Sequence, residues 1–271
     1  MIPRNFVAIS GVSNEEQLGE IHKICQEEGI NFPIAIGYQV SNKSINQGTQ
    51  NPRQPRFIDL GNLSKETLEY RFVPAVHYYT KDNQAIPGDL EKIAEIGVDP
   101  NLALLQFNTL PPSIDILRKG KEMGFGIIFK VAVSNKQTDR GGYAVWKGKG
   151  VQDVKEGEVN PLINQILERK DFIDYAMFDP SHGTNLDLDL DESSLAIRFG
   201  REIASREYLN HLGLVYAGGI KPTNVRAITR SFHSFFPNRV SIDIESGVRK
   251  DNQLNLDRVR DYLIGYKEVT S

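Results

Sequence analysis

The sequence predicts an α/β protein, a (β/α)8 TIM barrel in which eight strands alternate with eight helical segments. One reason is that short apolar runs are followed repeatedly by stretches of helical periodicity. Another is that the last third of the chain holds two consecutive units of strand, glycine turn and helix, with the turns at Gly218-Gly219 and Ser246-Gly247. Because 271 residues suit one barrel, we predict a single domain over residues 1–271.

The predicted strands are apolar runs that end at glycine, polar or charged residues. They lie at residues 6–10, 34–38, 71–79, 102–107, 125–133, 175–179, 214–217 and 240–244. The first predicted helix begins at a cap at Ser13 or Asn14 and ends at Gly29, and the second follows the polar segment after the second strand. The other predicted helices cover residues 89–96, 112–122, 161–169, 193–212, 225–232 and 256–266.

Two connections are much longer than the others, and they follow the second and the fifth strands, at residues 41–59 and 134–158. In a barrel of this kind, long loops after strands lie on the C-terminal face, where ligands bind. The first is rich in Asn, Gln and Pro, which is as typical of a disordered surface insertion as of a binding loop. In the second, Tyr143 and Trp146 favour a contact role, since a solvated loop gains nothing from two aromatic side chains.

Composition indicates a globular protein with no global charge bias. The hydrophobic fraction is 39%, the formal net charge is -3 and the pI is near 6.0, which gives no electrostatic reason to expect nucleic acid or membrane as a partner. The single cysteine, Cys25, excludes an intramolecular disulfide and fits a reducing compartment. No apolar stretch approaches the length of a membrane span, so we predict a cytoplasmic protein. The sequence predicts no particular oligomeric state.

Alternation along the strands separates residues that face the helices from those that face the barrel interior. In the last strand the apolar residues take the helix side, so Asp243 and Glu245 point into the barrel or its mouth. By the same rule Lys130 is interior, and Asp179 and Ser10 stand at the mouth, each at the end of its strand. A buried lysine among carboxylates is either a structural ion pair or a functional amine.

Five groups of residues at the predicted strand ends form a recognisable series. They are Ile9-Ser10-Gly11-Val12-Ser13-Asn14; Leu105-Gln106-Phe107-Asn108; Phe178-Asp179 with His182-Gly183-Thr184 and Asp187; Ala217-Gly218-Gly219-Ile220-Lys221-Pro222-Thr223-Asn224-Val225; and Asp243-Ile244-Glu245-Ser246-Gly247-Val248. In this order, and over nearly the whole chain, the series resembles the motifs of the phosphoribosylanthranilate isomerase family, barrel enzymes of the tryptophan pathway.

The resemblance implies an Amadori rearrangement, in which an aminoaldose phosphate becomes an aminoketose phosphate. Asp179 matches the family's general acid, which acts at the ring oxygen, and Ser10 stands where the family has its general base, a cysteine. The resemblance implies that the phosphate binds to Gly218, Gly219, Ser246 and Gly247. The resemblance and the strand positions together predict further substrate contacts at Lys130, Gln106, Gly183, Thr184, Lys221, Asp243 and Glu245. The expected partner is an anionic, phosphorylated small molecule.

Three departures from the family pattern affect this expectation. A serine hydroxyl is too weak a base for Ser10 to replace the cysteine, and losing a general base typically costs roughly 10² to 10⁴ in rate. The isomerisation then needs another base, such as Asp187 or Glu245. Glu245 also stands where the family has a small hydroxyl residue, and a carboxylate about 4 Å from a phosphate costs about 4 kcal/mol at an effective dielectric near 20. Either Lys221 and Arg249 pair with Glu245, or it points elsewhere, or the ligand is not a phosphate. The third departure is an asparagine, residue 108, in place of a histidine.

Three hypotheses follow. The first is an isomerase or related sugar-phosphate enzyme with Asp179 as general acid. The second is a ligand-binding homologue that has lost the isomerase chemistry, with Ser10 as its mark. The third is a lyase or aldolase in which Lys130 forms a Schiff base, which requires a desolvated amine with a lowered pKa.

The remaining polar residues receive structural interpretations. Cys25 lies on an apolar helix face and is predicted to belong to the core. His77 and His182 are isolated, and no spacing of His, Cys or carboxylate residues resembles a metal site, so we predict neither metal nor cofactor. Arg53 and Arg56 are within reach of an anionic substrate, but we interpret them as solvated side chains of the first polar connection.

Overall fold

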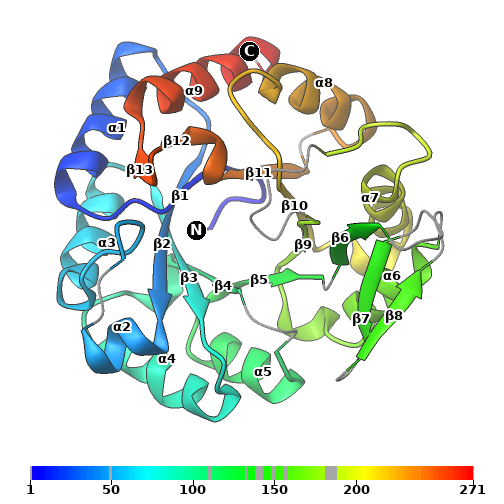
Figure 1. The fold of residues 1–271 in the computed structure, drawn as a ribbon, viewed down its shortest axis with the longest axis horizontal. Coiled ribbons are helices and arrows are strands. Elements are labelled where there is room, and N and C mark those ends of the chain that lie inside the picture. The colour runs from blue at the N-terminus through cyan, green and yellow to red at the C-terminus, as the bar shows by residue number, and fades with distance from the viewer. Residues whose placement is uncertain are drawn as a thin grey trace.

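The computed structural model contains the predicted closed barrel of parallel strands (Figure 1). It describes residues 2–48, 51–108, 112–131, 133–137, 143–147, 150–154, 158–180, 188–237 and 239–270, with the backbone alone for residues 134–137, 143–147 and 150–154. The barrel strands are β1 (Val7–Ser10), β2 (Ile34–Ser41), β3 (Val73–Tyr79), β4 (Leu104–Phe107), β5 (Gly126–Lys130), β9 (Tyr175–Phe178), β10 (Gly213–Ala217) and β11 (Val240–Ile244). They follow one another around the barrel as β1-β11-β10-β9-β5-β4-β3-β2.

Helices surround these strands as an outer ring (Figure 1). They are α1 (Glu15–Glu27), α2 (Asn42–Gln47), α3 (Leu60–Glu69), α4 (Ile86–Glu95), α5 (Ile114–Glu122), α6 (Asn160–Leu167), α7 (Leu195–Ser205), α8 (Val225–Phe235) and α9 (Leu256–Thr270). Short 3-10 turns also occur, at η1 (Phe57–Asp59), η2 (Asn83–Ala85), η3 (Pro100–Leu102), η4 (Lys170–Phe172), η5 (Glu207–Leu209) and η6 (Ser246–Val248). The predicted (β/α)8 fold class is therefore confirmed.

Side-chain caps set several helix boundaries. The carboxamide of Asn14 accepts a hydrogen bond from the Gln17 amide, so α1 begins where the sequence predicts. Ser113, rather than the prolines before it, caps α5. The predicted helix over residues 193–212 is wrong in its second half, because Arg206 adopts an extended backbone (φ -98°, ψ 111°) and the chain turns through η5 before β10.

Both long connections contain secondary structure. After β2, Ser41 and Ser44 form a reciprocal capping box that starts α2, and η1 leads into α3. After β5 the chain forms a three-stranded antiparallel sheet of β6 (Val133–Gln137), β7 (Tyr143–Lys147) and β8 (Gly150–Val154), drawn at the rim of the barrel in Figure 1. The prediction that Tyr143 and Trp146 make contacts concerns side chains outside the described part of the structure.

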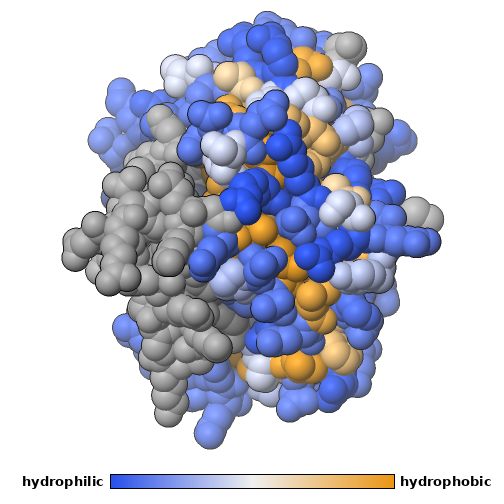
Figure 2. Space-filling view, turned by 90° about the vertical axis from the view of Figure 1, so that its right-hand side faces the viewer, coloured by the Kyte–Doolittle hydropathy of each residue, from blue (hydrophilic) through white to orange (hydrophobic). Residues whose placement is uncertain are grey.

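The core has two layers, as alternation along the strands requires. The larger cluster lies between the strands and the helices and contains Cys25, as predicted. The smaller cluster fills the barrel from within; its members are Phe6, Ala8, Ala35, Ala75, Leu104, Ile128, Tyr175, Met177, Val215 and Ala217. On the flank seen in Figure 2, hydrophilic side chains dominate and hydrophobic ones show between them, so the helices turn polar faces outward. Polar residues occupy the barrel interior at the C-terminal ends of the strands.

Candidate active site

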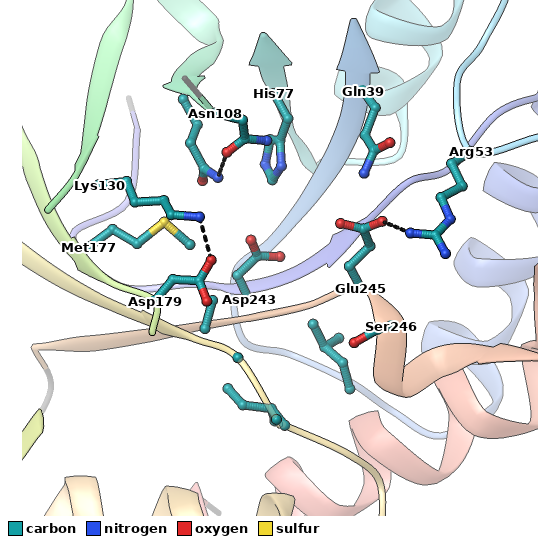
Figure 3. A pocket seen from close by; sticks show the side chains of 16 residues that line it. Gln39, Arg53, His77, Asn108, Lys130, Met177, Asp179, Asp243, Glu245 and Ser246 are labelled. Atoms are coloured by element: carbon teal, nitrogen blue, oxygen red, sulfur yellow. Dashed lines mark hydrogen bonds and ion pairs between the residues drawn. The ribbon is translucent and has the colours of Figure 1, made fainter. Parts of the chain in front are cut away.

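A cavity of about 290 Å³ lies at the C-terminal ends of the barrel strands (Figure 3). Most of its walls are polar, because here the interior positions of the strands carry polar and charged side chains. The lining residues are Gln39, Arg53, His77, Gln106, Asn108, Lys130, Met177, Asp179, Ala217, Gly218, Gly219, Ile220, Asp243, Ile244, Glu245 and Ser246. The position and size suit a small polar ligand.

Lys130 and Asp179 form an ion pair on one side of this cavity. Lys130 is the last residue of β5, Asp179 follows β9, and these two strands are neighbours in the barrel. The Nζ atom of Lys130 donates a hydrogen bond of 2.6 Å to Oδ2 of Asp179, and the two side chains are 15% and 12% exposed. A pair so well shielded from water is held firmly, and it places an ammonium proton beside a carboxylate that faces the ligand space.

Asp243 is a second carboxyl group of the cavity, and it is almost completely buried. Its side chain comes from β11 and points into the cavity (Figure 3). Burial raises its pKa from 3.8 to about 7, and the negative charge of Asp179 adds to the increase. A hydrogen bond from Ser10 and the positive charge of Lys130 act in the opposite direction. Asp243 therefore changes its protonation state near neutral pH.

Ser10 lies behind Asp243 and is not among the residues that line the cavity. Its side chain is fully buried, and its Oγ atom donates a hydrogen bond of 2.6 Å to Oδ1 of Asp243. Gly37, its register partner on β2, makes room for this hydroxyl, since a Cβ atom at Gly37 would lie 2.4 Å from Ser10 Oγ. Ser10 thus contacts the cavity through Asp243.

Glu245 is held by two arginines at the mouth of the cavity. Its Oε1 atom lies 3.2 Å from Nη1 of Arg53 and 3.9 Å from Nε of Arg249. Arg53 also donates a hydrogen bond of 2.6 Å to Asn252, so the connection after β2 is tied to the loop after β11. The negative charge of Glu245 is therefore balanced by Arg249, as one of the sequence-based alternatives states, and by Arg53, which that alternative did not include.

A third part of the wall is uncharged. His77 on β3 is buried, and burial lowers its pKa to about 4, so its imidazole is neutral at physiological pH. Next to it, the carboxamide of Gln106 donates a hydrogen bond of 2.7 Å to Oδ1 of Asn108. Gln39 on β2 pairs in register with His77. This wall offers hydrogen bonds without charge, which suits the hydroxyl groups of a sugar.

Two glycine turns close the other side of the site. Gly218 and Gly219 follow β10 with φ angles of 93° and 64°, a left-handed backbone that favours glycine. Gly247 lies in η6, and a Cβ atom there would lie 2.1 Å from the carbonyl oxygen of Ile220, so this glycine lets the two turns pack against each other. Ser246 lines the cavity and Gly247 does not.

Asn224 fixes the conformation of the first turn. Its Oδ1 atom accepts a hydrogen bond of 2.7 Å from the Lys221 amide, and its Nδ2 atom donates one of 2.9 Å to the Gly219 carbonyl. Both polar atoms of the Asn224 side chain therefore bind the loop, and the side chain makes no capping hydrogen bond to α8. Lys221 lies on this loop and is not a lining residue.

The structure therefore brings most of the predicted site residues together. Those that line one cavity are Asp179, Gly218, Gly219, Ser246, Lys130, Gln106, Asp243 and Glu245. Gly183 and Thr184 lie outside the described residues, as do His182 and Asp187. The interpretation of Arg53 as a solvated side chain is wrong, because Arg53 lines the cavity and pairs with Glu245. His77, which is isolated in sequence, lines the cavity too. Strand alternation was the signal for His77, since Ala75 and His77 share one face of β3.

The described residues form neither a metal cluster nor a membrane-spanning helix. No group of three or more His, Cys, Asp or Glu residues there is arranged to hold a metal ion. None of the described helices combines the length and the apolar character needed to span a membrane.

Solved structures of phosphoribosylanthranilate isomerase share this fold. The enzyme from Thermotoga maritima aligns with 98% of this chain and 100% of its own length, at a TM-score of 0.60 and 18% identity. The enzyme from Pyrococcus furiosus gives the same coverage, a TM-score of 0.57 and 16% identity. A third structure is a complex with reduced 1-(o-carboxyphenylamino)-1-deoxyribulose 5-phosphate; it covers 97% of this chain and 99% of its own, at a TM-score of 0.60 and 19% identity.

Neither a family profile nor a curated protein matches the sequence. The solved structures confirm, at the level of the fold, the likeness to phosphoribosylanthranilate isomerase that the sequence motifs suggest.

Proposed function

We propose that this chain is a divergent phosphoribosylanthranilate isomerase-like enzyme, which rearranges a phosphorylated aminoaldose into the corresponding aminoketose. The observation that carries the proposal is the pairing of two buried carboxyl groups, Asp179 and Asp243, in one cavity that the glycine turns after β10 and β11 close. An aldose-to-ketose rearrangement requires one proton donor and one proton acceptor around the same sugar, and it requires no metal.

The phosphate is assigned to the glycine side of the cavity. Gly218 and Gly219 expose backbone amides there, and Ser246 adds a hydroxyl. Arg53 and Arg249 offset the charge of Glu245 at the same mouth, which removes the main electrostatic objection to an anion. The ligand of the third structure above is a phosphorylated compound of this kind, which supports the same assignment.

The acid role belongs to Asp179, as the sequence motif implies. In the proposed first step Asp179 passes to the ring oxygen the proton that Lys130 donates to it, the C1–O bond breaks, and C1 becomes a protonated imine. Lys130, 2.6 Å away, is the source of that proton and recovers it through Asp179 at the end of the reaction. The second step removes the proton from C2 and requires a base, since Ser10 has no free lone pair of sufficient basicity.

The Schiff-base alternative is disfavoured by the same ion pair. An amine needs a free lone pair to attack a carbonyl group, and the Nζ atom of Lys130 is engaged as a hydrogen-bond donor to Asp179 at 2.6 Å. Borohydride reduction in the presence of a carbonyl substrate distinguishes this mechanism, because it traps a covalent adduct only if Lys130 forms an imine.

The test is turnover of phosphoribosylanthranilate by the purified chain. Carbon-13 NMR follows it directly, because the reaction turns C2 from an alcohol carbon into a ketone carbonyl. In parallel, cells that lack phosphoribosylanthranilate isomerase are complemented with the native chain and with Ser10→Cys. Turnover and growth with the native chain support the proposal. Tight binding of the reduced aminoketose phosphate without turnover by either protein would instead indicate a ligand-binding homologue, and neither binding nor turnover would reject both.

A further inference from the structure

We propose that Asp243 is the proton acceptor of the rearrangement, in place of a residue at position 10, and that Ser10 is its positioning residue. This inference rests on the proposed function and names the missing base of that reaction. It differs from the sequence-based alternatives, which placed the base at Asp187 or Glu245.

The position of Asp243 fits the role. It lies in the barrel interior at the end of β11, beside β1, which carries Ser10, and its carboxyl group lines the cavity (Figure 3). Ser10 occupies one carboxyl oxygen, Oδ1, at 2.6 Å. The hydroxyl proton is thereby directed at Asp243, so Ser10 acts as a donor in this structure. Oδ2 of Asp243 is left to meet a ligand.

Burial and the charged and titratable groups around Asp243 together bring its pKa close to neutral pH. Burial is the largest cause that raises the pKa of Asp243, and Asp179, after β9, adds to it, while the hydroxyl of Ser10 on β1 and the charge of Lys130 on β5 lower it. His77 on β3 is neutral, Tyr262 on α9 interacts electrostatically with Asp243 from the helix layer, and Glu245 lies two residues further along the chain, just after β11. The result, a pKa of about 7, is close to the best value for a base that must both accept and release a proton at physiological pH.

Other described groups of the cavity serve this purpose less well. The carboxylate of Glu245 is engaged by two arginines at the mouth, so it is not free to approach C2. His77 has its pKa lowered to about 4, so it holds an abstracted proton weakly. Asp179 is bound to Lys130 and is needed as the acid.

The proposed step balances in protons and electrons. After Asp179 has protonated the ring oxygen and the ring has opened, the carboxylate of Asp243 takes the proton from C2. The electrons of the C2–H bond form a C1–C2 double bond, and those of the imine return to nitrogen. The enol hydroxyl at C2 then gives its proton to Asp179, and so back to Lys130, while Asp243 returns its proton to C1 and the ketone forms. Asp179, Lys130 and Asp243 end in the protonation states in which they began, and no other reactant is consumed.

The role of Ser10 can be measured separately from its packing. A hydrogen bond from its hydroxyl stabilises the ionised form of Asp243, so Ser10→Ala is expected to raise the pKa of that group. Ser241→Ala is the matched control. Ser241, on β11, is buried as Ser10 is, but its Oγ atom accepts a hydrogen bond from the Phe6 amide, below the cavity. It removes a buried hydroxyl without touching Asp243.

The experiment is the pH profile of kcat/KM with phosphoribosylanthranilate for the native chain, Ser10→Ala, Ser241→Ala and Asp243→Asn. Folding of each variant is confirmed by circular dichroism. We expect an acid limb near pH 7 in the native chain. In Ser10→Ala the limb moves to higher pH, with a loss of roughly tenfold at pH 6 and recovery in alkali. Asp243→Asn loses roughly 10² to 10⁴ at every pH, and Ser241→Ala keeps the native profile.

The outcomes separate the inference from the proposed function. An inactive native chain overturns both. An active native chain whose Asp243→Asn variant is folded and comparably active overturns the inference alone, as does an acid limb that Ser10→Ala leaves in place. If Ser241→Ala moves the limb as far as Ser10→Ala does, the effect of Ser10 is structural and its assigned role is wrong.

Discussion

The cluster of Glu245 and its two arginines predicts how the site treats an anionic ligand. Arg53 lines the cavity and pairs with Glu245 at 3.2 Å, while Arg249 lies at 3.9 Å and is nearly buried. Replacing Glu245 with glutamine removes a negative charge near the proposed phosphate position and leaves both cations. Replacing Arg53 with alanine removes one positive charge there and leaves the carboxylate of Glu245 with Arg249 alone. We expect the first variant to bind an anion more tightly than the native chain and the second to bind it more weakly.

The expected size follows from the geometry. A unit charge about 4 Å from the ligand's phosphate interacts with it by about 4 kcal/mol at an effective dielectric near 20 and by about 1 kcal/mol in bulk water. The side chains of Arg53 and Glu245 are 36% and 30% exposed, which places the contribution of each near the lower end, at about 1 to 2 kcal/mol. A change of about 1.4 kcal/mol is tenfold in affinity. We therefore expect roughly tenfold weaker binding for Arg53→Ala, roughly tenfold tighter binding for Glu245→Gln, and near-native binding for the double variant.

Isothermal titration calorimetry with reduced 1-(o-carboxyphenylamino)-1-deoxyribulose 5-phosphate measures these affinities, and titrations at two salt concentrations show how much of each change is electrostatic. Arg56→Ala is the control, because Arg56 belongs to the same connection but pairs with Asp59 at 2.6 Å and does not line the cavity. Weaker binding by Glu245→Gln would refute the reasoning, since it would mean that the carboxylate itself holds the ligand. An equal loss in Arg56→Ala and Arg53→Ala would refute it too.

Three further predictions concern stability and reactivity. The folded pKa of Asp243, about 7, lies above its ordinary value of 3.8, so its contribution to stability is complete below pH 3.8 and is lost as the pH rises to 7. Asp243→Asn should abolish this fall, on the order of 4 kcal/mol, in urea titrations from pH 4 to 8. Gly11→Ala should lower the melting temperature markedly, because Gly11 has φ 84° and a Cβ atom there would lie 1.8 Å from Nη2 of Arg249, whereas Gly88→Ala, at an open position in α4, should raise it slightly. Borohydride treatment with substrate should leave Lys130 unmodified in a peptide mass map, and a reduced adduct there would revive the lyase mechanism.

Much of the fold was predictable because strand and helix signals are local. Apolar runs bounded by glycine or charge located the barrel strands, and β11 was predicted with its observed bounds. The failures concern contacts that a single segment does not encode. The end of α7 at Ser205 depends on the turn that leads into β10, and the capping box that starts α2 lies inside a segment whose composition suggests disorder.

The site was predictable where alternation along a strand decides which way a side chain points. This rule placed Lys130 and Asp243 in the cavity, and it would have placed His77 and Gln39 there as well. It could not find Arg53, because that residue reaches Glu245 from 192 positions away, on a connection without strand periodicity. Nor could it rank the carboxyl groups by basicity, since burial and neighbouring charges set the pKa of Asp243.

The departures from the isomerase motifs are connected through β11 and the loop that follows it. Ser10 donates a hydrogen bond to Asp243, and the next residue, Gly11, accepts one of 2.6 Å from the Arg249 guanidinium, which also faces Glu245. The end of β1 therefore supports both the proposed base and the charge balance at the mouth. Because the two contacts use different atoms, changes at Ser10 should act on kcat and its pH dependence, and changes at Glu245 should act on KM. A double-mutant cycle of Ser10→Ala with Glu245→Gln tests this separation: near-additive effects support it, and a coupling above about 1 kcal/mol would show that the base and the mouth act as one unit.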